Sequence, residues 1–189
     1  MDAKAFDSTL QRARTQTERL AWFGALLTKE THLEGRLVIV GGSAIEIYLG
    51  SDQYVSEDID VVGEKARIKT VLERWGFSEV SGRDRRRYLV KAGVGQVDLV
   101  GPQEKSGLPA RKEETTHRPV LLAPVEYLIA RRLVMAAQEK SPERFSQAVA
   151  LAVESGDGLD WDYIEGNARY ERVLPLYQQL CDRVKALTT

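Results

Sequence analysis

The sequence predicts an α/β fold, with a mixed sheet flanked by helices and then an all-helical C-terminal part. Up to about residue 103, short apolar segments rich in β-branched residues alternate with amphipathic segments, a pattern typical of alternating strands and helices. From Pro124 onward, apolar residues recur only at helical spacing. We therefore expect an α/β domain over 1–103, and a linker with a helical domain over 104–189.

The composition limits the class of protein. Hydrophobic residues make up 43% of the 189 residues and charged residues 29%, which is enough for a packed core. The net charge of −1 provides no overall attraction to nucleic acid or to an anionic membrane. No apolar run is long enough to cross a bilayer. One cysteine and two histidines exclude an internal disulfide and a Cys/His zinc site, so we expect a cytoplasmic protein without a membrane partner.

The N-terminal part is expected to begin with one helix over residues 8–30, because its apolar residues fall on one face. Elements then follow in the order strand, helix, strand, helix, strand and β-hairpin, expected at 37–40, 43–49, 59–62, 64–75, 77–80, and 86–91 with 96–100. The glycines at 93 and 95 permit the hairpin turn.

The segment over 103–119 is polar and contains two prolines, so it is expected to be a loop or linker. Pro124 is suited to the start of a helix, where its missing N–H costs little. Ser141 is expected to cap the next helix. The predicted helices span 125–138, 142–154, 160–168 and 170–187.

The turn after the first strand has the features of a phosphate site. Gly41 and Gly42 follow Val38-Ile39-Val40 directly, and glycines let backbone N–H groups approach a ligand without a Cβ in the way. A helix starting near Ser43 would direct its free N–H groups and its positive dipole end at that point, and the Ser43 hydroxyl would add a donor. The alternative is a tight structural turn capped by this serine. Neither G-x-x-x-x-G-K-[ST] nor G-x-G-x-x-G is present.

A pair of aspartates lies in the second strand. Asp58 and Asp60 are separated by Ile59, so they point to the same side of the strand with Cβ atoms about 6.5–7 Å apart. Two carboxylates there repel one another unless a cation lies between them. Carboxylate oxygens with water and substrate phosphates suit Mg²⁺, or Mn²⁺ in its place. The alternative is a solvated acidic strand end.

A third aspartate, Asp98, lies in the apolar segment Val97-Asp98-Leu99-Val100. An unpaired ionised carboxylate in a core is costly. If this strand neighbours the Asp58/Asp60 strand, three carboxylates converge, as in sites that hold two metals about 3.5–4 Å apart for in-line displacement at phosphorus. Asp58 and Asp60 would then hold metal, and Asp98 would also accept a proton. The alternative is an edge strand whose aspartate faces water.

The Gly41-Gly42-Ser43 turn, the Asp58-x-Asp60 strand and the later Asp98 together resemble the nucleotidyltransferase superfamily, which has the DNA polymerase β-like fold. More narrowly, VGGSAIEIYLG followed by SEDIDVV resembles the AbiEii/MenA-type toxins and their bacterial relatives. A weaker likeness continues into PVEYLIARRLVMA and LDWDYI. Three motifs in the same order make a more specific signal than any one of them.

The resemblance implies a magnesium-dependent enzyme that transfers a nucleoside monophosphate from an NTP to a hydroxyl. The acceptor would belong to tRNA or another RNA, a protein or a small molecule, and an antitoxin protein would be a further partner. Asp58, Asp60 and Asp98 would be the catalytic and metal-binding residues. Gly41, Gly42 and Ser43 would bind the nucleotide. Relatives carry a lysine in the helix after the sheet, and Arg132 would take its place.

The sequence departs from these relatives at two further places. Tyr54 stands where they often carry an arginine, and Arg144-Phe145 stands where many carry Lys-Asp. The lost carboxylate leaves metal binding intact but weakens the case for nucleotide positioning. The alternative function is therefore a catalytically degenerate member of this fold, which binds a nucleotide or a partner without turnover.

Overall fold

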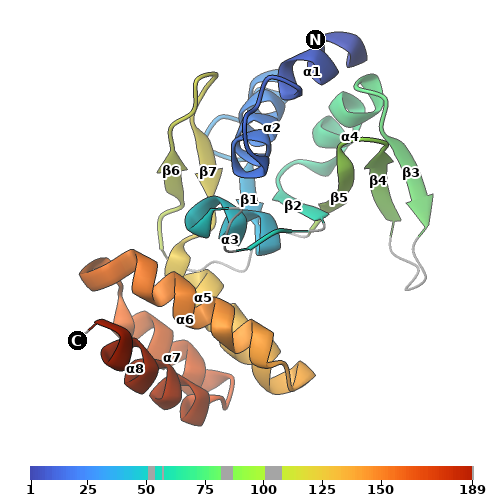
Figure 1. Cartoon of the computed structure of the whole chain (residues 1–189). Coiled ribbons are helices and arrows are strands. Elements are labelled where there is room, and N and C mark those ends of the chain that lie inside the picture. Colours follow the sequence, from blue (N-terminus) through green and yellow to red (C-terminus); the bar gives the residue numbers. More distant parts are fainter. Residues whose placement is uncertain (51–53, 57, 82–86, 101–107, 189) are drawn as a thin grey trace. The chain divides into compact units, whose positions relative to one another are not determined.

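In the computed structural model the chain forms two compact units, Met1–Ala123 and Pro124–Thr189. The structure describes residues 1–50, 54–56, 58–81, 87–100 and 108–188. Within these ranges the first unit holds a mixed seven-stranded sheet with flanking helices, and helices α5 to α8 form the second unit (Figure 1). The predicted α/β class with a helical C-terminal part is confirmed.

The sheet has the strand order β3-β4-β5-β2-β1-β7-β6. Two neighbouring pairs, β1 with β7 and β2 with β5, are parallel, and the other pairs are antiparallel. The β4–β5 hairpin forms as predicted. The strands span Val38–Val40 (β1), Asp58–Val62 (β2), Ser78–Ser81 (β3), Arg87–Lys91 (β4), Gly95–Leu99 (β5), Arg111–Glu113 (β6) and Val120–Leu122 (β7).

The single helix predicted over 8–30 is wrong, because two helices occupy this region. These are α1 (Ala3–Leu10) and α2 (Gln16–Thr31). The Thr15 side chain accepts a hydrogen bond from the Glu18 N–H at 3.0 Å, and the Glu18 carboxylate accepts one from the Arg14 N–H at 2.6 Å. This reciprocal capping starts a new helix at residue 16. The other helices of this unit, α3 (Gly41–Leu49) and α4 (Lys65–Arg74), lie close to their predicted positions.

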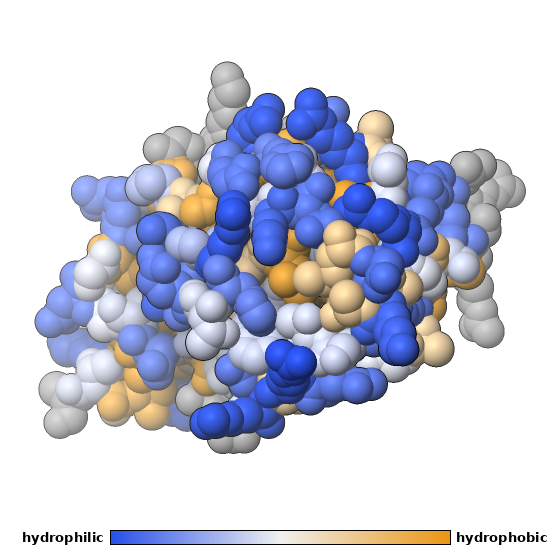
Figure 2. All heavy atoms as spheres, turned by 90° about the horizontal axis from the view of Figure 1, so that it is seen from above, coloured by the Kyte–Doolittle hydropathy of each residue, from blue (hydrophilic) through white to orange (hydrophobic). Residues whose placement is uncertain are grey.

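The core of the first unit is rich in aromatic side chains from its helices. Phe6 stacks on Trp75 with ring centroids 4.1 Å apart, and Phe23 meets both rings edge-on. Ile59, Val61 and other strand residues belong to the same buried cluster. The face seen in Figure 2 is mainly hydrophilic, with smaller apolar areas between the charged side chains. On β2, Ile59 and Val61 pack into this core, and Asp58 and Asp60 lie on the opposite side of the strand.

The first unit extends beyond the expected boundary at residue 103, which itself lies outside the described residues. Within the expected linker, β7 pairs in parallel with β1 and β6 pairs with β7. These strands have only three residues each, and β6 consists of Arg111, Lys112 and Glu113, so the sequence pattern did not reveal them. Pairing with β1 is what makes this segment part of the sheet, up to Ala123.

The second unit consists of helices, as predicted. They are α5 (Val125–Glu139), α6 (Pro142–Ser155), α7 (Trp161–Tyr170) and α8 (Leu174–Thr188), with a single 3₁₀ turn at Gly156–Gly158. Ser141 caps α6 as expected, because its side chain accepts a hydrogen bond from the Arg144 N–H. Among the described residues, no helix is both long enough and apolar enough to cross a membrane.

Candidate functional site

The predicted glycine turn joins β1 directly to α3. The helix begins at Gly41, two residues earlier than expected, and its N-cap residue Val40 makes no side-chain hydrogen bond. The first N–H groups of a helix have no partner within the helix, and the helix dipole makes this end favourable for an anion. The start of α3 is therefore a candidate site for a phosphate group.

Gly41 lies against the carboxylate of Asp60. Its φ of +61° favours glycine, and a Cβ at this position would lie 1.9 Å from Oδ2 of Asp60. The contact follows from strand pairing, since Val40 stands opposite Asp60 in the antiparallel β1–β2 pair. Any side chain at residue 41 would displace the carboxylate, so the glycine allows the direct contact that strand pairing creates.

The three predicted aspartates lie on neighbouring strands. Ile59 and Val61 are buried at 4% and 0% exposure, whereas Asp58 and Asp60 are partly exposed, so the expected alternation along β2 is confirmed. In the parallel β2–β5 pair, Asp60 stands opposite Asp98. Residues in register on adjacent strands point to the same face, and the structure therefore brings Asp60 and Asp98 together, with Asp58 two residues along.

The edge-strand alternative for Asp98 is wrong, because β5 lies between β4 and β2.

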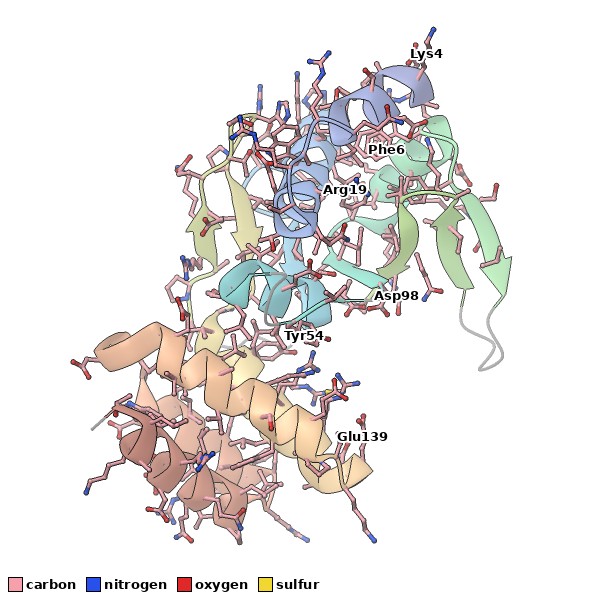
Figure 3. All side chains as sticks on the ribbon, viewed as in Figure 1. Lys4, Phe6, Arg19, Tyr54, Asp98 and Glu139 are labelled. Carbon is pink, nitrogen blue, oxygen red and sulfur yellow. The ribbon has the colours of Figure 1, made fainter. Side chains whose placement is uncertain are left out.

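The β2–β5 pairing also adds Gln96 to the candidate site. This residue stands opposite Asp58, and sequence reasoning missed it. Its amide could donate to a phosphate or accept from a bound water. Figure 3 shows the Asp98 and Tyr54 side chains at the same end of the first unit, near α3.

The carboxylate oxygens of these three aspartates are the type of ligand that a hard divalent cation such as magnesium prefers. Within the described part of the chain, no three His, Cys, Asp or Glu side chains gather closely enough to form a preformed metal cage. Magnesium, however, is usually held by one or two carboxylates together with waters and substrate phosphates. The in-register Asp60–Asp98 pair, with Asp58 beside it and the helix start in contact with Asp60, fits that mode of binding.

A hydrogen-bond network that sequence reasoning missed connects α3 to the start of β2. The Ser43 hydroxyl donates to the carbonyl oxygen of Asp58 at 2.5 Å, and the Ser56 hydroxyl donates to the same oxygen at 2.8 Å. The Ser56 N–H donates to Glu46 at 2.7 Å. Ser43 is fully buried, so its hydroxyl is engaged within the protein, contrary to the donor role expected for it, and its backbone N–H is the group at the helix start.

Tyr54 lies beside the glycine turn. A Cβ on Gly42 would lie 3.0 Å from the Tyr54 hydroxyl and 2.5 Å from Oγ of Ser56. Residue 42 must therefore be small, and the start of α3 is bordered by two hydroxyl groups. Tyr54 thus places a neutral hydroxyl group beside the start of α3.

Arg132 belongs to the second unit and is only 6% exposed. Its Nη1 lies 3.1 Å from Sδ of Met135, one turn further along α5. The expected nucleotide contact of Arg132 stays a prediction. In the next helix, Nε of Arg144 lies 3.3 Å from a carboxylate oxygen of Glu139, so this cation is already paired within its own unit.

Comparison with solved structures identifies the class of fold. An antigenic nucleotidyltransferase-like protein from Paracoccidioides brasiliensis matches with a TM-score of 0.61 and 15% identity, over 91% of this chain and 94% of that one. ANT(2″)-Ia in complex with adenylyl-2″-tobramycin matches with a TM-score of 0.49 and 18% identity, over 86% and 95% of the two chains. A solution structure of ANT(2″)-Ia matches with a TM-score of 0.48 and 18% identity, over 100% and 97%.

The first of these matches shows that the chain has a nucleotidyltransferase-like fold. No protein-family model matches the sequence, and no curated protein matches it either. The expected relation to AbiEii/MenA-type toxins is not shown.

Proposed function

We propose that this chain is a magnesium-dependent nucleotidyltransferase, which transfers a nucleoside monophosphate from an NTP to an acceptor hydroxyl. The observation that carries the proposal is the contact between the start of α3 and Asp60, with Asp98 in register beside Asp60. A helix start binds phosphate and adjacent carboxylates bind a divalent cation. The reaction needs both within a few ångströms.

The residues have separate tasks in this reaction. The backbone N–H groups of Gly41, Gly42 and Ser43 hold the phosphates of the NTP. Asp58, Asp60 and Asp98 hold Mg²⁺ or Mn²⁺. Bound there, the cation neutralises phosphate charge and favours the deprotonated acceptor oxygen.

The transfer itself balances without any further reagent. The acceptor oxygen forms a bond to the α-phosphorus, the bond from that phosphorus to the bridging oxygen breaks, and pyrophosphate leaves. Asp98 accepts the proton of the acceptor hydroxyl. Glycine and backbone groups at the helix start stabilise the charge that develops on the phosphate oxygens, because preorganised donors cost no reorganisation during the reaction.

The experiment uses each of the four NTPs labelled at the α-phosphate, with Mg²⁺ or Mn²⁺. It offers three acceptor pools: total RNA including tRNA, a protein lysate, and hydroxyl-bearing small molecules such as aminoglycosides. Pyrophosphate release together with label in one pool is the expected result, and Asp60→Asn should abolish both. Equal release from Asp60→Asn and from the unaltered protein would overturn the proposed site. A cognate antitoxin, as the toxin resemblance implies, would suppress the labelling when added.

A second candidate is a nucleotide- or partner-binding module without turnover. It is favoured by the Ser43 hydroxyl, which already donates to the carbonyl oxygen of Asp58. Such a module would show thermal stabilisation by an NTP with Mg²⁺ and no pyrophosphate release. Measuring both quantities on one sample separates the two functions.

A further inference from the structure

Glu46 is a buried carboxylate that the proposed reaction does not use. It lies in α3 between Ile45 and Ile47 and has 0% exposure. One of its oxygens accepts the hydrogen bond from the Ser56 N–H, and the other, Oε1, is buried without a partner among the described residues. Burial of a carboxyl group with one unsatisfied oxygen is costly. An apolar side chain of similar volume would fill this place at lower cost, so stability alone does not explain this glutamate.

Ser56, the partner of Glu46, is itself hydrogen-bonded to Asp58. Ser56 donates through its hydroxyl to the carbonyl oxygen of Asp58, which also accepts from the Ser43 hydroxyl. Glu46 and Ser43 both lie in α3, so the segment entering β2 is bonded to this helix at two places. The position of Asp58 relative to the helix start depends on these bonds.

The same segment borders the proposed phosphate site. Oγ of Ser56 and the Tyr54 hydroxyl lie 2.5 Å and 3.0 Å from where a Cβ on Gly42 would be. A shift of Ser56 would therefore change both the Asp58 position and the space beside Gly42. The hydrogen bond from the Ser56 N–H to Glu46 therefore links α3 to both of these features, alongside the direct bond from the Ser43 hydroxyl to Asp58.

We propose that Glu46 is a positioning residue for nucleotidyl transfer, which acts through the Ser56 N–H to hold Asp58 and the Tyr54–Ser56 segment against the start of α3. The proposal rests on the proposed function. Glu46 does not touch the substrate, and its effect is exerted on the geometry of a metal-holding strand.

Two substitutions of Glu46 separate positioning from packing. Glu46→Gln retains a carbonyl oxygen that can accept from the Ser56 N–H, whereas Glu46→Met fills a similar volume without this acceptor. We expect Glu46→Met to lower kcat about 10- to 100-fold with KM for the NTP changed less than about threefold, since a small displacement near reacting groups has this effect. Glu46→Gln should restore most of kcat. Both variants should unfold at or above the temperature of the unaltered protein.

A control substitution removes a different buried and unpartnered polar atom from the same unit. Thr28 in α2 is 6% exposed, and its hydroxyl oxygen has no partner among the described residues. Thr28→Val should leave kcat unchanged. A Glu46→Met protein with the kcat of the unaltered protein would overturn the proposal, and so would equal losses in Glu46→Gln and Glu46→Met.

Amide hydrogen exchange of Ser56, followed by NMR, tests the same bond without reference to activity. We expect exchange at least about 10-fold faster in Glu46→Met than in the unaltered protein, with Glu46→Gln near the unaltered rate. Equal exchange in all three proteins would overturn the proposal even if the enzyme is active. If the unaltered protein transfers no nucleotide, the proposed function fails, and the exchange rates still decide whether Glu46 holds Ser56.

Discussion

Asp60 of β2 stands opposite Asp98 of β5 in a parallel pair, and Gly41 lies against the Asp60 carboxylate. Two acidic side chains and a helix start thus meet in the interior of a sheet, since β5 and β2 are both central strands. Like charges in neighbouring positions repel, and a divalent cation with a phosphate ligand would offset that repulsion.

The first prediction concerns Asp98→Asn. The substitution should remove most of the thermal stabilisation by Mg²⁺, because it takes away one of the proposed carboxylate ligands. It should also lower pyrophosphate release at least about 100-fold. Thermal unfolding with Mg²⁺ or with EDTA measures the first effect, and pyrophosphate release measures the second.

The control for this charge removal is Asp157→Asn, because Asp157 is exposed in the 3₁₀ turn of the second unit. It should change neither the metal response nor the activity. An Asp98→Asn protein that keeps the full Mg²⁺ response would contradict the assignment of this residue.

The second prediction concerns Gly41→Ala. The added methyl group would lie 1.9 Å from Oδ2 of Asp60, and φ at this position is +61°. Strain and the displaced carboxylate should cost about 1–3 kcal/mol of folding free energy and reduce kcat about 100-fold. Urea unfolding and steady-state kinetics measure the two effects.

Gly35→Ala is the matched control for backbone strain. Gly35 also has a positive φ, +73°, and nothing lies within 4 Å of its added Cβ. It should lose stability through strain without the loss of kcat. Equal kinetic effects at both glycines would argue against the contact with Asp60.

The third prediction concerns pH. Burial raises the pKa of Glu46 above its ordinary value of 4.5, and the hydrogen bond from Ser56 only partly offsets this. The folded protein therefore binds a proton at Glu46 more readily than the unfolded chain does. The resulting stabilisation is fully present below pH 4.5 and is lost as the pH rises through the folded-state pKa.

Glu46→Gln cannot titrate, so it should gain stability relative to the unaltered protein as the pH is raised from 4 through this window. Urea unfolding of both proteins across the pH series measures the difference. A constant difference at every pH would show that Glu46 does not titrate differently in the folded protein.

The fourth prediction concerns a hydrogen bond between α3 and the residue that follows β7. The Tyr48 hydroxyl donates to the carbonyl oxygen of Ala123 at 2.9 Å, and the Arg111 guanidinium lies over the Tyr48 ring at 4.8 Å. Tyr48→Phe should lower the free energy of unfolding by about 1 kcal/mol, because Ala123 is buried and loses a donor. Tyr170→Phe is the matched control, since Tyr170 is 83% exposed, and it should change stability by less than about 0.5 kcal/mol.

The features that sequence alone determined here are local ones. The side on which Asp58 and Asp60 lie follows from the two-residue period of a strand, and the turn at Gly41 follows from the conformational freedom of glycine. The helical half was predictable because its apolar residues repeat at helical spacing and Ser141 has the chemistry of a cap. The break between α1 and α2 was also local, and the Thr15–Glu18 capping pair is the signal that could have revealed it.

Features that depend on contacts between segments distant in the sequence were decided only by the tertiary structure. The register that sets Asp60 opposite Asp98 arises from strand pairing, which the sequence of either strand does not encode by itself. The short strands β6 and β7 exist because β1 offers them a partner, which is why the predicted linker belongs to the sheet. The hydrogen bond from the Ser56 N–H to Glu46 also forms only when α3 packs against the segment that precedes β2. Before folding, the Glu46 carboxylate is hydrated by water, so its sequence position alone does not specify a hydrogen-bond partner.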